Sequence, residues 1–170
     1  MSKDVKKYGP YDHLQIMSFL PHRYPFLFVD RIISVEVPYS PDGKLQQVGT
    51  RVVGIKNATI NEPYFTGHFP KLPITPGVVI IETMAQISSF AIMPWLKVDK
   101  DMRILSKFDL RLAGVDNTRF RRPFSPGECL KITIDVTKQR GPIWGFKCHG
   151  EVDGQPVVEA DVLASAVVED

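Results

Sequence analysis

One segment constrains the fold of this chain more than any other: residues 77–93 are apolar nearly all round and carry a single formal charge, Glu82. A helix over this segment would be about 25 Å long, and Pro94 would stop it. Thr75 is expected to cap that helix, with Pro76 at its first position. A helix without a polar face must be covered on most sides, so the remaining chain has to supply the cover.

The segments on either side of this helix suggest how it is covered. Four prolines between residues 63 and 76 exclude a regular helix or central strand there, which predicts an ordered loop. Apolar and polar residues alternate with period two after the helix, which is typical of half-buried strands. Strands are expected over residues 26–37, 48–56, 104–112, 131–136, 144–148 and 162–168. A curved antiparallel sheet of about six strands around one long central helix is an α+β architecture, the hot-dog fold.

Length and composition narrow the class of protein. The 170 residues are predicted to form a single domain, with residues 1–11 as a flexible N-terminal extension. Asp12 and Gln15 form a capping-box pattern, which predicts a short helix after that extension. A net charge of +2 argues against a general nucleic-acid binder, and the interrupted apolar stretch argues against a membrane span. Two cysteines without CxxC spacing indicate a reduced, cytoplasmic environment.

Glu82 is the most informative polar residue. Burying an unpaired carboxylate is expensive, so this side chain must either find a partner or keep its proton. Gln86 and Ser89 follow at i+4 and i+7 and form one polar stripe with it. The pattern fits a catalytic carboxylate, and it also fits a structural hydrogen-bond cluster at a subunit contact.

His68 stands between Gly67 and the Phe69–Pro70 pair on the loop that leads into the same helix. A histidine titrates near neutral pH, which suits proton transfer, although a lone loop histidine is more often structural. The other histidines are weaker candidates, as a helix-surface residue, a loop residue and an outward strand position: His13, His22 and His149. No pair of histidines has metal-ligand spacing, so no metal site is expected.

The start of the central helix is a third candidate. The first backbone N–H groups of a helix have no intrahelical partner, and Gly77 leaves space for a carbonyl to approach them. Such an N–H can act as an oxyanion donor, or it can simply belong to a capped helix. The sequence contains no GxSxG, no GxGxxG after a strand and no Walker loop, which weakens serine-hydrolase and nucleotide-binding hypotheses.

Four runs make the chain recognisable: LPHRYPFLFVDR (20–31), NEPYFTGHFP (61–70), PGVVIIETMAQ (76–86) and AGVDNTRFRRP (113–123). From about residue 14 to residue 166 the sequence resembles the 3-hydroxyacyl-acyl carrier protein dehydratases of bacterial fatty-acid synthesis. The resemblance implies dehydration of a (3R)-hydroxyacyl thioester to the trans-2-enoyl thioester, without a cofactor or metal. It also implies a partner, an acyl carrier protein whose 4'-phosphopantetheine carries the acyl chain.

The resemblance assigns roles to the candidate residues. His68 would take the proton from C2, while Glu82, kept at least partly protonated by its apolar helix, would help the C3 hydroxyl leave as water. The Gly77 N–H would polarise the thioester carbonyl. Val78, Phe69 and Pro70 would complete the oxyanion and substrate-binding site. The family site forms across a homodimer interface, and the dimers commonly assemble into a trimer of dimers.

Two further expectations follow from the same resemblance. Arg119, Arg121 and Arg122 would lie near the mouth of the acyl tunnel and dock the carrier protein, unless they form internal ion pairs. A related dehydratase-isomerase class tends to carry Asp where this chain has Glu82, so the plain dehydratase is favoured. The alternatives are a hot-dog thioesterase, an enoyl-CoA hydratase, or a non-catalytic acyl-binding module.

Overall fold

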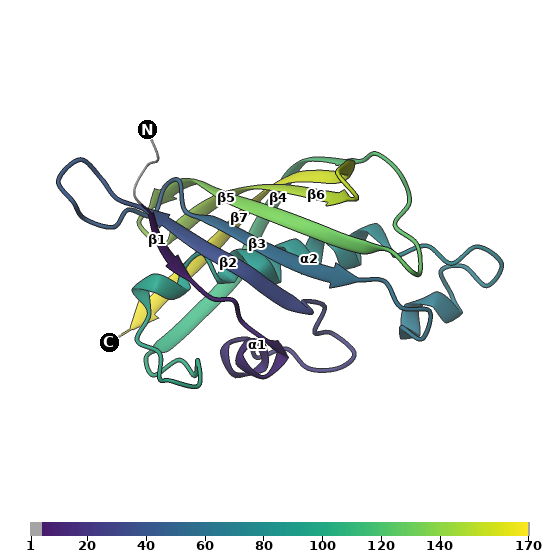
Figure 1. Ribbon diagram of the computed structural model, residues 1–170, viewed down its shortest axis with the longest axis horizontal. Coiled ribbons are helices and arrows are strands. Elements are labelled where there is room, and N and C mark those ends of the chain that lie inside the picture. The colour runs from purple at the N-terminus through teal and green to yellow at the C-terminus, as the bar shows by residue number, and fades with distance from the viewer. Residues whose placement is uncertain (1–4, 170) are drawn as a thin grey trace.

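The computed structural model describes residues 5–169 and shows one antiparallel sheet of seven strands that curves around a central helix (Figure 1). The strands lie in the order β1-β2-β3-β5-β6-β7-β4. Their bounds are β1 (Val5–Tyr8), β2 (Arg31–Pro38), β3 (Arg51–Asn57), β4 (Lys107–Phe120), β5 (Cys129–Arg140), β6 (Ile143–Val152) and β7 (Gln155–Glu169). The helices are α1 (His13–Phe19) and α2 (Gly77–Ser89), with 3-10 turns η1 (Pro63–Thr66) and η2 (Met93–Trp95). The predicted hot-dog architecture is confirmed.

Helix α2 packs against the inner face of the sheet through apolar side chains. Ile80, Met84 and Ile87 are buried against inward-facing residues of the strands. One close approach is at β3, where a Cβ added to Gly54 would lie 2.7 Å from Cδ1 of Ile87. The helix is therefore wrapped on most sides, as its apolar surface requires.

The ends of α2 differ from the prediction. The helix begins at Gly77 with Pro76 as its N-cap residue, and Thr75 forms no side-chain cap. The reason is that the backbone N–H of Thr75 donates to the Phe124 carbonyl, at 2.8 Å, which holds the residue outside the helix. The helix ends at Ser89, four residues earlier than predicted, and the chain then turns into η2.

The N-terminal region is more ordered than the predicted extension over residues 1–11. Val5–Tyr8 pair antiparallel with β2, from Val5 opposite Pro38 to Tyr8 opposite Val35, which raises the strand count from about six to seven. Residues 1–4 lie outside the described part of the chain. The capping box of Asp12 and Gln15 is present at the start of α1, as predicted.

Strand β2 begins at Arg31, five residues later than predicted. Its expected first residues bond to a side chain of α2 rather than to a neighbouring strand: Phe28 N–H donates to Gln86 Oε1, and Gln86 Nε2 donates to the Phe26 carbonyl. A polar residue of the helix thus replaces the sheet as hydrogen-bond partner for residues 26–28.

Residues Gly77–Trp95 are long and apolar enough to span a membrane by length and composition. In this fold 61% of that window is buried inside the protein, which is the pattern of a core helix. The sheet supplies the cover that this apolar segment requires.

Candidate active site

A cavity of about 540 Å³ opens beside Glu82, between the loop that follows α1, helix α2 and strand β4. Its polar lining includes His22, Arg23, Glu82 and Gln86, together with Arg103 and Asp109. Apolar side chains line much of the rest, including Phe108, Leu110 and Phe146. A few convergent polar groups in a largely apolar cavity are typical of a small-molecule site.

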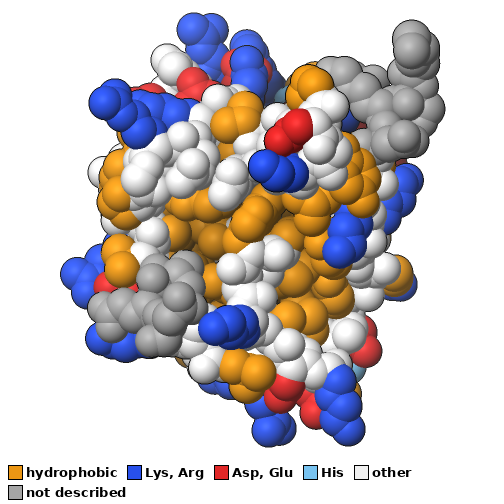
Figure 2. Space-filling model, turned by 90° about the vertical axis from the view of Figure 1, so that its left-hand side faces the viewer, with side chains coloured by type: hydrophobic (Ala, Val, Ile, Leu, Met, Phe, Trp, Pro, Cys, Tyr) orange, Lys and Arg blue, Asp and Glu red, His pale blue; other side chains and the backbone are white. Residues whose placement is uncertain are grey.

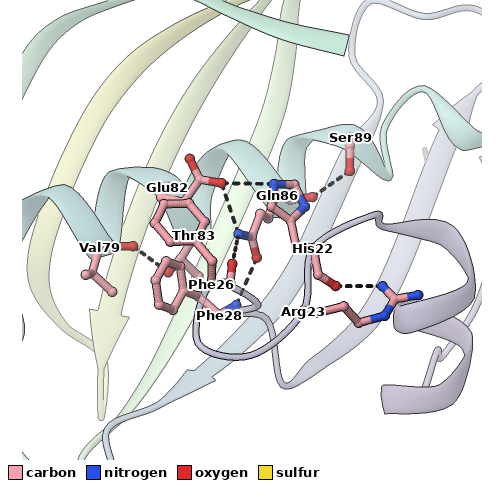
Figure 3. Close-up of polar contacts among 9 residues, drawn as sticks. All are labelled: His22, Arg23, Phe26, Phe28, Val79, Glu82, Thr83, Gln86 and Ser89. Atoms are coloured by element: carbon pink, nitrogen blue, oxygen red, sulfur yellow. Dashed lines mark hydrogen bonds and ion pairs between the residues drawn. The ribbon is translucent and has the colours of Figure 1, made fainter. Parts of the chain in front are cut away.

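Two side chains contact the same oxygen of Glu82 (Figure 3). Gln86 Nε2 donates to Glu82 Oε1 at 3.0 Å, and His22 Nε2 lies 3.4 Å from that atom. The orientation of the Gln86 amide is fixed, because only its oxygen can accept the Phe28 N–H. Its nitrogen therefore faces the Phe26 carbonyl and Glu82, and Gln86 is only 2% exposed. The amide holds the carboxylate in one place.

This environment corrects the expectation that Glu82 stays partly protonated. Burial raises the pKa of Glu82, but hydrogen bonds from His22 and Gln86 and the charge of His22 outweigh it, so the pKa lies below its ordinary value. In the single chain Glu82 is thus an ionised carboxylate that contacts His22 and Gln86. Ser89, the third member of the predicted stripe, instead donates to the Gln86 backbone carbonyl.

His22 contributes to this site, although its sequence context predicts only a loop residue. Its ring lies against Glu82 through Nε2, while its Nδ1 is buried without a hydrogen-bond partner in the described structure. The contact joins residues 60 positions apart, and hydrophobic periodicity carries no information about such loop contacts. The only available signal was the run LPHRYPFLFVDR, whose similarity to known dehydratases extends over this histidine.

His68 lies on the loop between η1 and α2, and its ring is held on one side. Nδ1 is 2.8 Å from the Ile74 carbonyl oxygen. A carbonyl can only accept, so Nδ1 carries the hydrogen and Nε2 of the neutral ring is the basic nitrogen. His68 is absent from the described residues that line the Glu82 cavity. In the single chain the two predicted catalytic groups therefore do not line the same cavity.

The other predicted binding residues lie at the start of α2 and on the loop that precedes it. Val78 is 77% exposed, and Phe69 and Phe120 are each half-exposed. A Cβ added to Gly77 would lie 2.7 Å from Cζ of Phe120, so only glycine fits against this ring as it stands. The end of β4 therefore packs on the helix start that carries the predicted oxyanion donor. Pro70 is exposed on the same loop as Phe69.

Two of the three predicted docking arginines form ion pairs within the chain. Arg121 pairs with Glu159 at 2.5 Å, and Arg122 pairs with Glu128 at 2.7 Å. Arg119 is exposed on β4. The alternative of internal ion pairs thus applies to Arg121 and Arg122.

Comparisons with known proteins agree with this fold and show the family of the chain. A family model described as a FabA-like domain matches residues 20–161. The 3-hydroxyacyl-[acyl-carrier-protein] dehydratase FabZ of Allorhizobium ampelinum is 42% identical over 167 residues, which is 98% of this chain and 97% of that protein.

Two solved structures share the fold. The dehydratase heterocomplex ApeI:P from Xenorhabdus doucetiae has a TM-score of 0.61 at 19% identity and covers 93% of this chain and 91% of its own. A hot-dog-like protein from Thermanaerovibrio acidaminovorans has a TM-score of 0.56 at 16% identity, covering 72% of this chain and 84% of its own. On the family match and the 42% identity over nearly its whole length, the chain belongs to the FabA-like family.

Proposed function

We propose that this protein is a cytoplasmic hydro-lyase of one domain that dehydrates (3R)-hydroxyacyl-acyl carrier protein to the trans-2-enoyl form in fatty-acid elongation. The observation that carries this proposal is the 42% identity to a 3-hydroxyacyl-[acyl-carrier-protein] dehydratase over 98% of the chain. The matched residues 20–161 include both His68 and Glu82. The reaction removes a proton from C2 and the hydroxyl from C3 without an external oxidant or reductant, so acid–base groups suffice and no cofactor or metal is proposed.

His68 is the base in this proposal. With Nδ1–H donating to the Ile74 carbonyl, Nε2 takes the proton from C2 and the C2–H electron pair forms the double bond. The imidazolium that results is stabilised, because its Nδ1–H continues to donate to the same carbonyl. The N–H groups of Gly77 and Val78 have no intrahelical acceptor and are available to the thioester oxygen, which makes the C2 proton more acidic.

Glu82 is the acid. Its Oε1 accepts the contacts from Gln86 and His22, which leaves Oε2 to face the C3 hydroxyl. The C3–O bond breaks, the hydroxyl takes a proton from Glu82, and water leaves. Because Glu82 is ionised in the single chain, the proposal requires that the bound acyl chain or a second subunit raise its pKa by excluding water. Return of the proton from His68 through water resets the site.

The protein acts as a homodimer in this proposal, with His68 and Glu82 of one site supplied by different chains. Strand β4 supports the idea, because it is an edge strand whose outer side is unpaired within residues 5–169. Leu112, Val115 and Phe120 are exposed along it. A hydrophobic surface is also present at the end of the molecule that lies on the left in Figure 1, where Figure 2 shows hydrophobic side chains gathered in the middle and Lys and Arg side chains around their margin. Assembly into a trimer of dimers is a further prediction.

A single assay separates this function from the alternatives. The protein is incubated with crotonyl and 3-hydroxybutyryl thioesters of both acyl carrier protein and coenzyme A. A dehydratase changes enoyl absorbance with carrier-bound substrate, an enoyl-CoA hydratase prefers coenzyme A, and a thioesterase releases free thiol. An acyl-binding module produces none of these signals. Thiol release without a change in enoyl absorbance would contradict the proposal.

Gly77→Val is expected to lower kcat/KM by about 10²-fold, the loss typical of one missing oxyanion donor. The added side chain would collide with the Phe120 ring, because a Cβ at this position would lie 2.7 Å from the ring, and the collision would displace the helix start. Steady-state kinetics on crotonyl thioester measure the effect. Gly43→Asn is the control, since Gly43 has a φ of +80° that asparagine tolerates and nothing lies within 4 Å of its Cβ position. Equal losses in both variants would show that the donor lies elsewhere.

Arg119→Glu is expected to raise the KM for carrier-bound substrate while leaving a short carrier-free thioester unaffected. Arg119 is exposed near the end of β4, the strand whose last residue, Phe120, packs against the helix start, and the family resemblance assigns this region to the mouth of the acyl tunnel. Charges at the rim of an interface change association more than chemistry, and their effect weakens with salt. Added salt should therefore affect the wild type more than the variant. The same loss on both substrates would assign Arg119 a structural role.

A further inference from the structure

A lysine occupies an inward position of β3. Exposed and covered residues alternate along this strand, and Val52, Gly54 and Lys56 lie on the covered face. The Lys56 side chain is only 4% exposed, and its strand partner is the fully buried Leu130. Lysine is almost never buried this far without a partner, so its contacts need an explanation.

The ammonium of Lys56 is held by two acceptors. It donates to Glu62 Oε1 at 2.6 Å and to the Asn57 carbonyl at 2.7 Å. The Glu62 side chain is itself largely buried. A buried ion pair adds little stability over well-packed apolar residues of the same volume, but it fixes the distance and direction between the two groups. We therefore expect the Lys56–Glu62 pair to fix the position of nearby groups rather than to stabilise the fold.

Glu62 leads directly to the His68 loop. It is the N-cap residue of η1, and its carbonyl accepts the Phe65 N–H at 3.1 Å. The Tyr64 carbonyl within the same turn accepts the His68 N–H at 2.9 Å. Two hydrogen-bonded steps thus connect the buried ion pair to the backbone of His68.

The His68 loop is also held by hydrogen bonds to Ile74, on the C-terminal side of His68. The Ile74 N–H donates to the His68 carbonyl at 3.0 Å, and the Ile74 carbonyl accepts from His68 Nδ1. The next residue, Thr75, is anchored to Phe124. His68 therefore lies between two anchors, one of which is the Lys56–Glu62 pair on the sheet.

We propose that Lys56 and Glu62 are positioning residues that hold the His68 loop, so that Nε2 of His68 is presented to the substrate in one orientation. This inference rests on the proposed function, because it assigns to the pair an effect on the base of that reaction. Neither residue touches the reacting atoms. Misplacement of a catalytic group by about 1 Å can cost about 10²-fold in rate, which is the size of effect such an anchor can control.

The test replaces both charges at once with K56M/E62L, which avoids a lone buried charge. The expected result is a kcat lowered by about tenfold to a hundredfold with KM unchanged, together with faster hydrogen exchange at the His68 amide and a changed His68 imidazole NMR signal. The control K131M/E151L removes an exposed ion pair between β5 and β6, 3.1 Å long, and should change none of these quantities.

Each outcome decides the proposal. A folded K56M/E62L protein with the wild-type kcat and an unchanged His68 signal would overturn it. If K56M/E62L does not fold, Glu62→Asp takes its place, because it keeps a negative charge for Lys56 but is one methylene shorter and so shifts the anchor; an unaltered kcat and His68 signal there would overturn the proposal equally. If the wild type itself lacks dehydratase activity, the proposed function fails, while hydrogen exchange and the His68 signal still test the anchoring.

Discussion

His68→Ala and Glu82→Gln are each expected to lower kcat for dehydration by about 10²–10⁴-fold, the contribution typical of a general base or acid. Alanine removes the imidazole Nε2 that is proposed to take the C2 proton. Glutamine keeps an oxygen for the contacts with Gln86 and His22 but has no proton of suitable pKa to give. Enoyl absorbance measures both losses, with thermal unfolding in parallel to show that each variant is folded.

The matched control for these variants is His13→Ala. His13 is exposed at the start of α1, so its removal should change neither kcat nor KM. Near-normal turnover in His68→Ala or Glu82→Gln would contradict the role assigned to that residue. A loss confined to KM would indicate that the residue binds substrate without taking part in the proton transfers.

The architecture was predictable because its signals are local. The apolar run over residues 77–93 contains α2, and each alternating segment overlaps one of the strands β3 to β7, although β4 runs on to Phe120 and β7 begins at Gln155, beyond the predicted ranges. Two of the misplaced boundaries have a common physical cause. Residues 26–28 look like a strand but bond to Gln86, and Thr75 looks like a cap but bonds to Phe124, so a distant partner decided each case. Strand β1 was missed for the same reason, since its order comes from pairing with β2.

The site could be predicted only in part. Glu82 stands out in the sequence because it is the single carboxylate of an apolar helix, and a buried charge is costly unless it has a partner. Its protonation could not be deduced from the helix alone, since His22 reaches it from a loop 60 residues earlier and lowers its pKa. The Lys56–Glu62 pair was equally invisible, because lysine at a strand position reads as solvent-facing until its burial is known.

The second large effect concerns where the two catalytic groups come from. His68 is not among the described residues that line the Glu82 cavity of its own chain, so we expect each site to combine His68 of one subunit with Glu82 of the other. A dimer of one His68→Ala chain and one Glu82→Gln chain then has one site with both groups intact and one site with neither.

Mixing the two inactive variants under conditions of subunit exchange should therefore restore activity. Random pairing of equal amounts makes about half of the dimers mixed, and one intact site in each gives about a quarter of the wild-type turnover. That is a gain of roughly 25-fold or more over variants reduced by 10²–10⁴-fold. The control mixes His68→Ala with the double variant H68A/E82Q, which cannot assemble an intact site. If differently tagged chains exchange and the first mixture still gains nothing, both groups act within one chain and the shared site is wrong.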